Sequence, residues 1–140
     1  MATSISPTSL AEFRHDLANP VNHVVGYAEL LVMGATERQA TELHTPLQAI
    51  SKCAADLRRH LEEHLPLIRI RSQEVDLPAV RTSVTASASE LLAEVARLKP
   101  QIRGRWAEAE EDLLQIEHAA HRLLELATRE VELLPPGRPG

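Results

Sequence analysis

Apolar residues recur in the first part of the chain at steps of three and four, the spacing that places side chains on one face of an α-helix. On a wheel of about 100° per residue they all fall within about 40° of one direction. Ser6-Pro7-Thr8-Ser9 is typical of a helix start, and Gly34 is expected to stop the helix. The residues of this first stripe are Leu10, Phe13, Leu17, Val21, Val24, Ala28 and Leu31.

A second stripe predicts another amphipathic helix from about Pro46, a residue that suits the first turn of a helix. Pro66 and residues 67–80, which include Pro78, are expected to form a connection. Alternatively, the second helix bends at Pro66 instead of stopping there. The second stripe consists of Leu47, Ile50, Ala54, Leu57, Leu61 and Leu65.

The same period continues through residues 81–134, where only Pro100 and Gly104 interrupt it. We therefore expect a hairpin of helices at about 82–103 and 105–134, with one long kinked helix as the alternative. Residues 1–8 are read as an N-terminal tail and residues 135–140 as a linker-like tail. The third stripe is Val84, Ala88, Leu91, Val95, Leu98, Ile102, Ala109, Leu113, Ile116, Ala120, Leu123 and Ala127.

These stripes predict an all-α fold in which helical hairpins form a four-helix bundle. A single hairpin, residues 9–66, cannot bury both of its own stripes, so further helices must cover them. We expect a homodimer; the alternative is an internal pseudo-dimer, in which the second half folds back. The segments 50–57 and 116–123 are weakly similar, which reflects either a repeat or a shared heptad period.

Composition narrows the class of protein. Aromatic residues are 2% of the chain, so the core must be aliphatic, which suits helix-on-helix packing. A net charge of −5 argues against a nucleic-acid partner. Without an apolar run of about 20 residues or a basic, apolar leader, we expect a cytoplasmic protein that does not contact a membrane. The single cysteine, Cys53, has no partner for an internal disulfide and is expected to pack in the core.

The polar side of the first helix carries the candidate chemistry. On the wheel, His15, Asn19, Asn22 and Gly26 lie opposite the apolar stripe, so we expect His15 to face solvent and partners. An exposed imidazole has a pKa near 6.5, so much of it is neutral at cellular pH and is able to act as a nucleophile.

The run Phe13-Arg14-His15-Asp16-Leu17-Ala18-Asn19-Pro20, continued by residues 21–31, resembles the H-box helix of histidine-kinase dimerisation and phosphotransfer domains from two-component systems. The resemblance covers about residues 9–66. It implies that His15 is the phospho-acceptor, that Asp16 orients the imidazole or acts as a base, and that Asn19 orients a water. Pro20 is expected to kink the helix. The residues predicted to contact a partner are Arg14, Asn22 and Gly26.

The chain departs from that family in its glycines. ATP-binding domains of these kinases carry Gly-rich and Asn-rich boxes, whereas the five glycines here form no cluster. We therefore expect no cofactor in this chain and no autonomous kinase activity. The expected partner is a response-regulator receiver domain, which would bring its own Mg²⁺, with an ATP-binding domain acting in trans as a further candidate. The alternative function is a non-catalytic dimerisation or scaffold domain with a vestigial H-box.

His60-Leu61-Glu62-Glu63-His64 fits the H-x-x-E-H pattern of one class of zinc enzymes. Helical spacing puts both imidazoles on one side, but His64 falls near the apolar stripe and no third ligand stands out. We therefore expect no metal site.

Overall fold

The computed structural model describes residues 7–72 and 75–129, and in these ranges the chain is helical without any strand. The all-α prediction is therefore confirmed. None of the helices in these ranges is both long enough and apolar enough to cross a membrane. The elements are α1 (Pro7–Glu37), η1 (Thr41–Leu43), α2 (His44–His64), α3 (Leu67–Ser72), α4 (Leu77–Ile102) and α5 (Ala107–Thr128).

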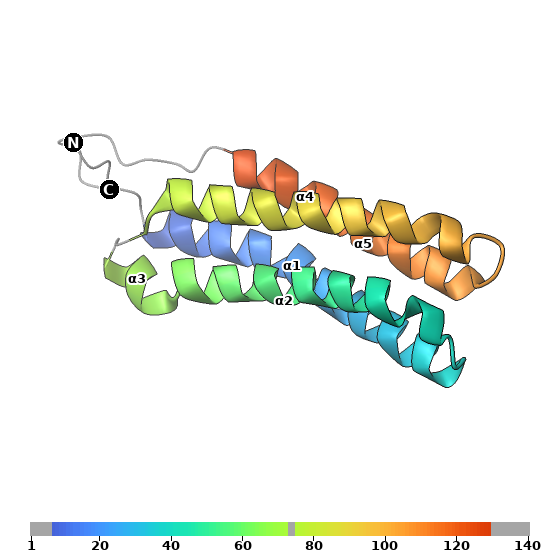
Figure 1. Ribbon diagram of the computed structural model, residues 1–140. Coiled ribbons are helices and arrows are strands. Elements are labelled where there is room, and N and C mark those ends of the chain that lie inside the picture. Colours follow the sequence, from blue (N-terminus) through green and yellow to red (C-terminus); the bar gives the residue numbers. More distant parts are fainter. Residues whose placement is uncertain (1–6, 73–74, 130–140) are drawn as a thin grey trace.

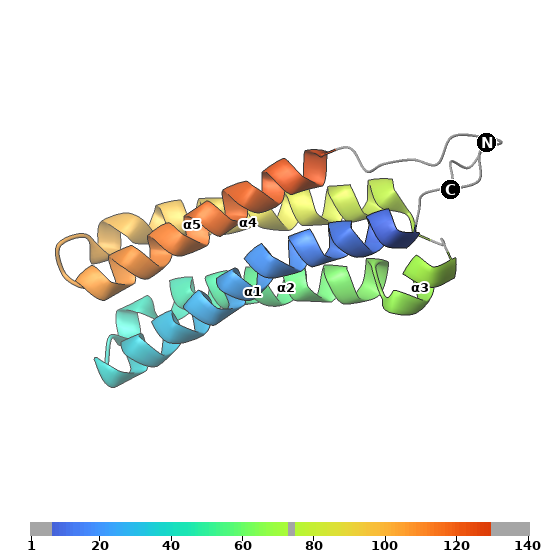
Figure 2. The ribbon, with the colours of Figure 1, turned by 180° about the vertical axis from the view of Figure 1, so that it is seen from behind.

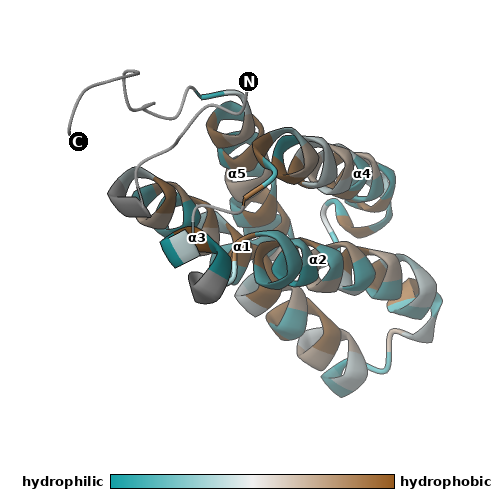
Figure 3. Ribbon diagram, turned by 90° about the vertical axis from the view of Figure 1, so that its left-hand side faces the viewer, coloured by the Kyte–Doolittle hydropathy of each residue, from teal (hydrophilic) through white to brown (hydrophobic). Residues whose placement is uncertain are grey.

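The four long helices form two antiparallel pairs, α1 with α2 and α4 with α5, that lie against each other (Figures 1 and 2). α1 packs against α2 and α5, while α4 packs against the same two helices. Each long helix therefore has two long neighbours. The view from one end shows brown and teal alternating around these helices, as their amphipathic sequences require (Figure 3).

Every residue of the three predicted stripes is buried, and these residues belong to one continuous core. The stripe of α4 and α5 is covered by α1 and α2 of the same chain. A second copy is thus not needed to bury it, and the homodimer stays a prediction.

Two helix boundaries differ from those expected. Gly34 does not end α1, which continues to Glu37. α4 begins at Leu77, inside the segment predicted as a connection, because Asp76 caps it by accepting a hydrogen bond from the Ala79 amide at 3.1 Å. Pro78 lies in the first turn of α4, where its missing N–H is harmless.

The expected connection also contains the short helix α3, so Pro66 separates two helices and α2 does not bend through it. The hairpin predicted near Gly104 is present. Gly104 has a φ of +73°, a left-handed conformation that glycine adopts without strain. Residues 1–6, 73–74 and 130–140 lie outside the described residues, and with them most of both predicted tails.

The two hairpins resemble each other in construction. The weakly similar segments lie in α2 and α5, the second helix of each pair. In the first pair, Arg14 Nε donates to the carbonyl of Leu65 at 2.8 Å. In the second, Arg81 Nη2 donates to the carbonyl of Arg129 at 2.8 Å. An arginine near the start of each first helix thus binds the C-cap carbonyl of the second helix.

Cys53 is buried in α2, and this burial, with the negative charges of Glu90 and Glu94, raises the pKa of its thiol to about 11. Little thiolate therefore forms at pH 8, and we predict that Cys53 reacts with a disulfide reagent roughly 100-fold more slowly than an exposed cysteine. The comparison is with Ser89→Cys, on the exposed side of α4, in a Cys53→Ala background. Equal reaction rates of Cys53 in the native wild-type chain and of the introduced cysteine in the native variant would contradict the buried position of Cys53.

Two glycines of α1 provide a matched test of packing. A Cβ at Gly34 would lie 2.5 Å from Cζ2 of the buried Trp106 ring, whereas a Cβ at Gly26 would have nothing within 4 Å. Alanine is favoured over glycine in a helix by about 1 kcal/mol, so Gly26→Ala should stabilise the protein by about that amount.

Gly34→Ala gains the same helix propensity but forces the Trp106 ring to move, at a cost of about 1–3 kcal/mol. We predict that it lowers the free energy of unfolding measured in urea. Equal stabilisation by both substitutions would show that Trp106 does not pack against Gly34.

Candidate functional site

His15 lies on the solvent side of α1, as its position opposite the apolar stripe predicted. Asn19, Asn22 and Gly26 are exposed on the same side. Among the described residues, nothing forms a hydrogen bond or an ion pair with the His15 ring. The imidazole is therefore accessible to a partner and has no competing interaction to break.

Asp16 pairs with a residue far away in the sequence. Its Oδ2 lies 2.6 Å from Nη2 of Arg129, which follows the last residue of α5. Within residues 7–72 and 75–129, no hydrogen bond joins Asp16 to His15. The expected role of Asp16 toward the imidazole stays a prediction.

Arg14, predicted to contact a partner, is partly buried and binds the end of α2 through its bond to the Leu65 carbonyl. This bond satisfies a carbonyl that the last turn of a helix leaves free. The structure therefore gives Arg14 a role in holding the α1–α2 pair together, and its contact with a partner stays a prediction.

Sequence reasoning missed two arginines, Arg81 and Arg129. Arg81 binds the carbonyl of Arg129, and the guanidinium of Arg129 binds Asp16, so a chain of polar contacts connects α4 and α5 to the residue beside His15. The side chain of Arg129 is 45% exposed. No spacing rule could have found these residues, because Arg129 reaches Asp16 only through the packing of α5 on α1, and Arg81 reaches Arg129 only through the pairing of α4 with α5.

Pro20 is buried within α1, and the helix continues through it. Pro20 lacks the N–H that would bond the Asp16 carbonyl one turn earlier, and the kink expected there stays a prediction. Gly26, in contrast, lies on the exposed side of α1, and a Cβ added there would have no heavy atom within 4 Å. No contact within the described chain requires a glycine at that position, which leaves room for close approach of another molecule.

A pocket of about 830 Å³ lies between the C-terminal part of α1 and the start of α2, and Val32, Ala35 and Leu47 are among its lining residues. It is at the end of α1 away from His15. The pocket is therefore separate from the candidate site.

Comparison of the chain with protein-family models, with curated proteins and with solved structures gave no match. The resemblance to the H-box helix accordingly rests on residues 13–20 and the run that follows them, together with the exposed position of His15.

Proposed function

We propose that this chain is a four-helix bundle of two-component signalling that presents His15 to the receiver domain of a response regulator. The supporting observation is the unpartnered, exposed His15 ring on the polar face of a helix whose opposite face is fully buried. A ring nitrogen attacks the phosphorus of the receiver's aspartyl phosphate. The N–P bond forms as the P–O bond breaks, the receiver's carboxylate leaves with the bonding electron pair, and the imidazole passes its N–H proton to water.

Arg129 supports this proposal electrostatically. Its guanidinium is close enough to Asp16 to form a hydrogen bond, and Asp16 is next to the acceptor in sequence. Arginine binds phosphoryl oxygens through paired N–H donors. In the proposed complex, Arg129 exchanges its exposed contact with Asp16 for the phosphoryl group, since an exposed ion pair contributes only about 0–1 kcal/mol.

The bundle carries a single acceptor. The buried positions of α1 recur in α4 at an offset of 67 residues, as Leu10 with Leu77 and Leu17 with Val84. This offset pairs Arg14 with Arg81 and His15 with Thr82, so the second hairpin has no histidine where the first has its acceptor. α4 and α5 then take the structural role that a second chain takes in the dimeric kinases that this sequence resembles. The homodimer expected from the sequence would double the acceptors without completing the core.

The phosphoryl group comes from a receiver domain or from an ATP-binding domain in trans, because the chain carries no glycine cluster to bind nucleotide phosphates. Mg²⁺ belongs to the receiver. Such exchange takes place in the cytoplasm, and neither a membrane nor a nucleic acid takes part in it.

A specific observation favours the second candidate, a non-catalytic scaffold. Arg14 and Asp16, the two neighbours of His15, both serve contacts between helices. A vestigial H-box would keep such contacts and lose the chemistry at His15. The two functions differ in whether His15 accepts phosphate.

We predict that receiver domains charged by acetyl phosphate transfer acid-labile phosphate to the full chain at His15. His15→Ala should abolish labelling without changing thermal stability, because an exposed side chain without partners contributes little to folding. The matched control is His23→Ala, another exposed histidine of α1. Labelling that persists in His15→Ala would contradict the assignment, and a wild-type chain unlabelled by every receiver would favour the scaffold.

Asn19 lies on the exposed face one turn from His15, where its amide is able to hold a water. We predict that Asn19→Ala slows dephosphorylation of a partner receiver more than it slows transfer to His15. Both rates are measured with the same receiver, and Gln48→Ala, which removes an exposed amide from α2, serves as the control for loss of surface polarity. An equal loss of both rates would point to damaged docking instead.

A further inference from the structure

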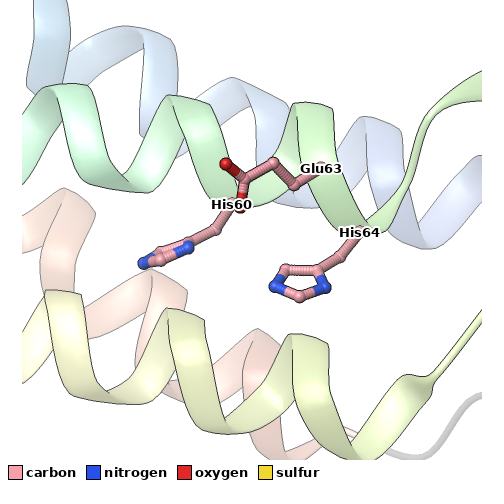
Figure 4. Close-up of side chains that lie close together, drawn as sticks. All are labelled: His60, Glu63 and His64. Atoms are coloured by element: carbon pink, nitrogen blue, oxygen red, sulfur yellow. The ribbon is translucent and has the colours of Figure 1, made fainter.

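His60, Glu63 and His64 project from the last turns of α2, and one donor atom from each residue lies within 4.8 Å of the others. Figure 4 shows the two imidazoles side by side above α4, with the Glu63 carboxylate near His60. The ring centroids are 6.1 Å apart. The third donor group beside the two imidazoles is the carboxylate of Glu63, which lies one helical turn from His60 on the same side of α2.

Two serines of α4 lie within hydrogen-bond distance of the two imidazoles. His60 Nε2 lies 3.0 Å from Ser87 Oγ, and His64 Nε2 lies 3.4 Å from Ser83 Oγ. Histidine ligands of metals commonly use one ring nitrogen for such an outer hydrogen bond, which fixes the ring and its tautomer. Nδ1 of His60 is buried and has no hydrogen-bond partner among the described residues.

An unpaired buried nitrogen is costly for a protein to keep, so its presence needs an explanation. One contact opposes the binding of a cation by Glu63: the ion pair between Arg59 Nε and Glu63 Oε1 at 3.5 Å. Both side chains are 56% exposed, so this pair is weak and Glu63 is free to exchange it for a cation.

We propose that His60, Glu63 and His64 form a binding site for Zn²⁺ at the seam between α2 and α4. Two imidazoles and a carboxylate are a donor set that zinc favours, with water completing a tetrahedron. Donor atoms around tetrahedral zinc lie roughly 3.3 Å apart, given metal–ligand distances of about 2.0–2.1 Å. The three donor atoms already lie within 4.8 Å of one another, so binding requires them to approach by at most about 1.5 Å.

The site has a structural consequence, because the serines that orient the ligands belong to the other hairpin. Zinc bound to α2 would strengthen the hold of His60 on Ser87 and of His64 on Ser83, and so the contact between α2 and α4. Binding to the folded chain alone raises its stability through mass action.

The test is a calorimetric titration of the full chain, stripped with a chelator, with zinc chloride. We expect one saturable zinc per chain and a higher melting temperature in its presence. Loss of an outer hydrogen-bond partner typically weakens metal affinity by roughly 10–100-fold, and we expect Ser87→Ala to fall in that range. Glu63→Gln and His64→Ala each remove a ligand and should weaken zinc affinity by more than that. Glu63 is exposed, so its substitution leaves the fold intact.

The matched control is His118→Ala, which removes one member of an exposed pair of histidines on α5, one turn apart, and should leave binding unchanged. Three results would overturn the proposal: no saturable binding to the wild-type chain, unchanged affinity in Glu63→Gln and His64→Ala, or an equal loss in His118→Ala.

Discussion

The mutual burial of one apolar face from each of the four long helices is the constraint on which the other features of this molecule depend. Each long helix is apolar along one side, and contact with the other helices removes that side from water. Because the core is made mainly of Leu, Ala, Val and Ile, the helices must approach closely, and at Gly34 the approach leaves no space for a Cβ beside Trp106. The same constraint fixes the rotation of α1, and His15 is exposed as a result.

The apolar stripes determine which helices pack together, and the polar contacts stabilise that arrangement. Arg14 and Arg81 each bind the C-cap carbonyl of the neighbouring helix, where unpaired carbonyls and the negative end of the helix dipole favour a cation. Arg129 then extends from α5 to Asp16 on α1. The two neighbours of His15, Arg14 and Asp16, thus contact the ends of α2 and α5.

Sequence reasoning found what depends on periodicity and missed what depends on tertiary contact. The buried stripes and the exposure of His15 follow from residue spacing along a helix, which a sequence displays directly. Local sequence predicts a stop at Gly34 because it does not display the approach of Trp106 that the glycine accommodates. It predicts a connection around Pro78 because the hydrogen bond by which Asp76 caps α4 forms only in the folded chain. Arg81 and Arg129 were missed because only the packing of the second hairpin brings them near α1.

The histidines of this chain differ in a way that matches two kinds of chemistry. A phospho-acceptor must meet a nucleophilic distance and angle set by its partner, so a ring without internal contacts is suited to that role, and His15 has none within the described chain. A metal ligand needs a ring held in place before the ion arrives, because ordering it costs binding free energy. His60 and His64 are held in this way by Ser87 and Ser83 of the facing helix. Histidine is therefore unrestrained on the outer face of α1, where no helix covers it. It is restrained at the seam between α2 and α4, because the serines of α4 face the imidazoles of α2.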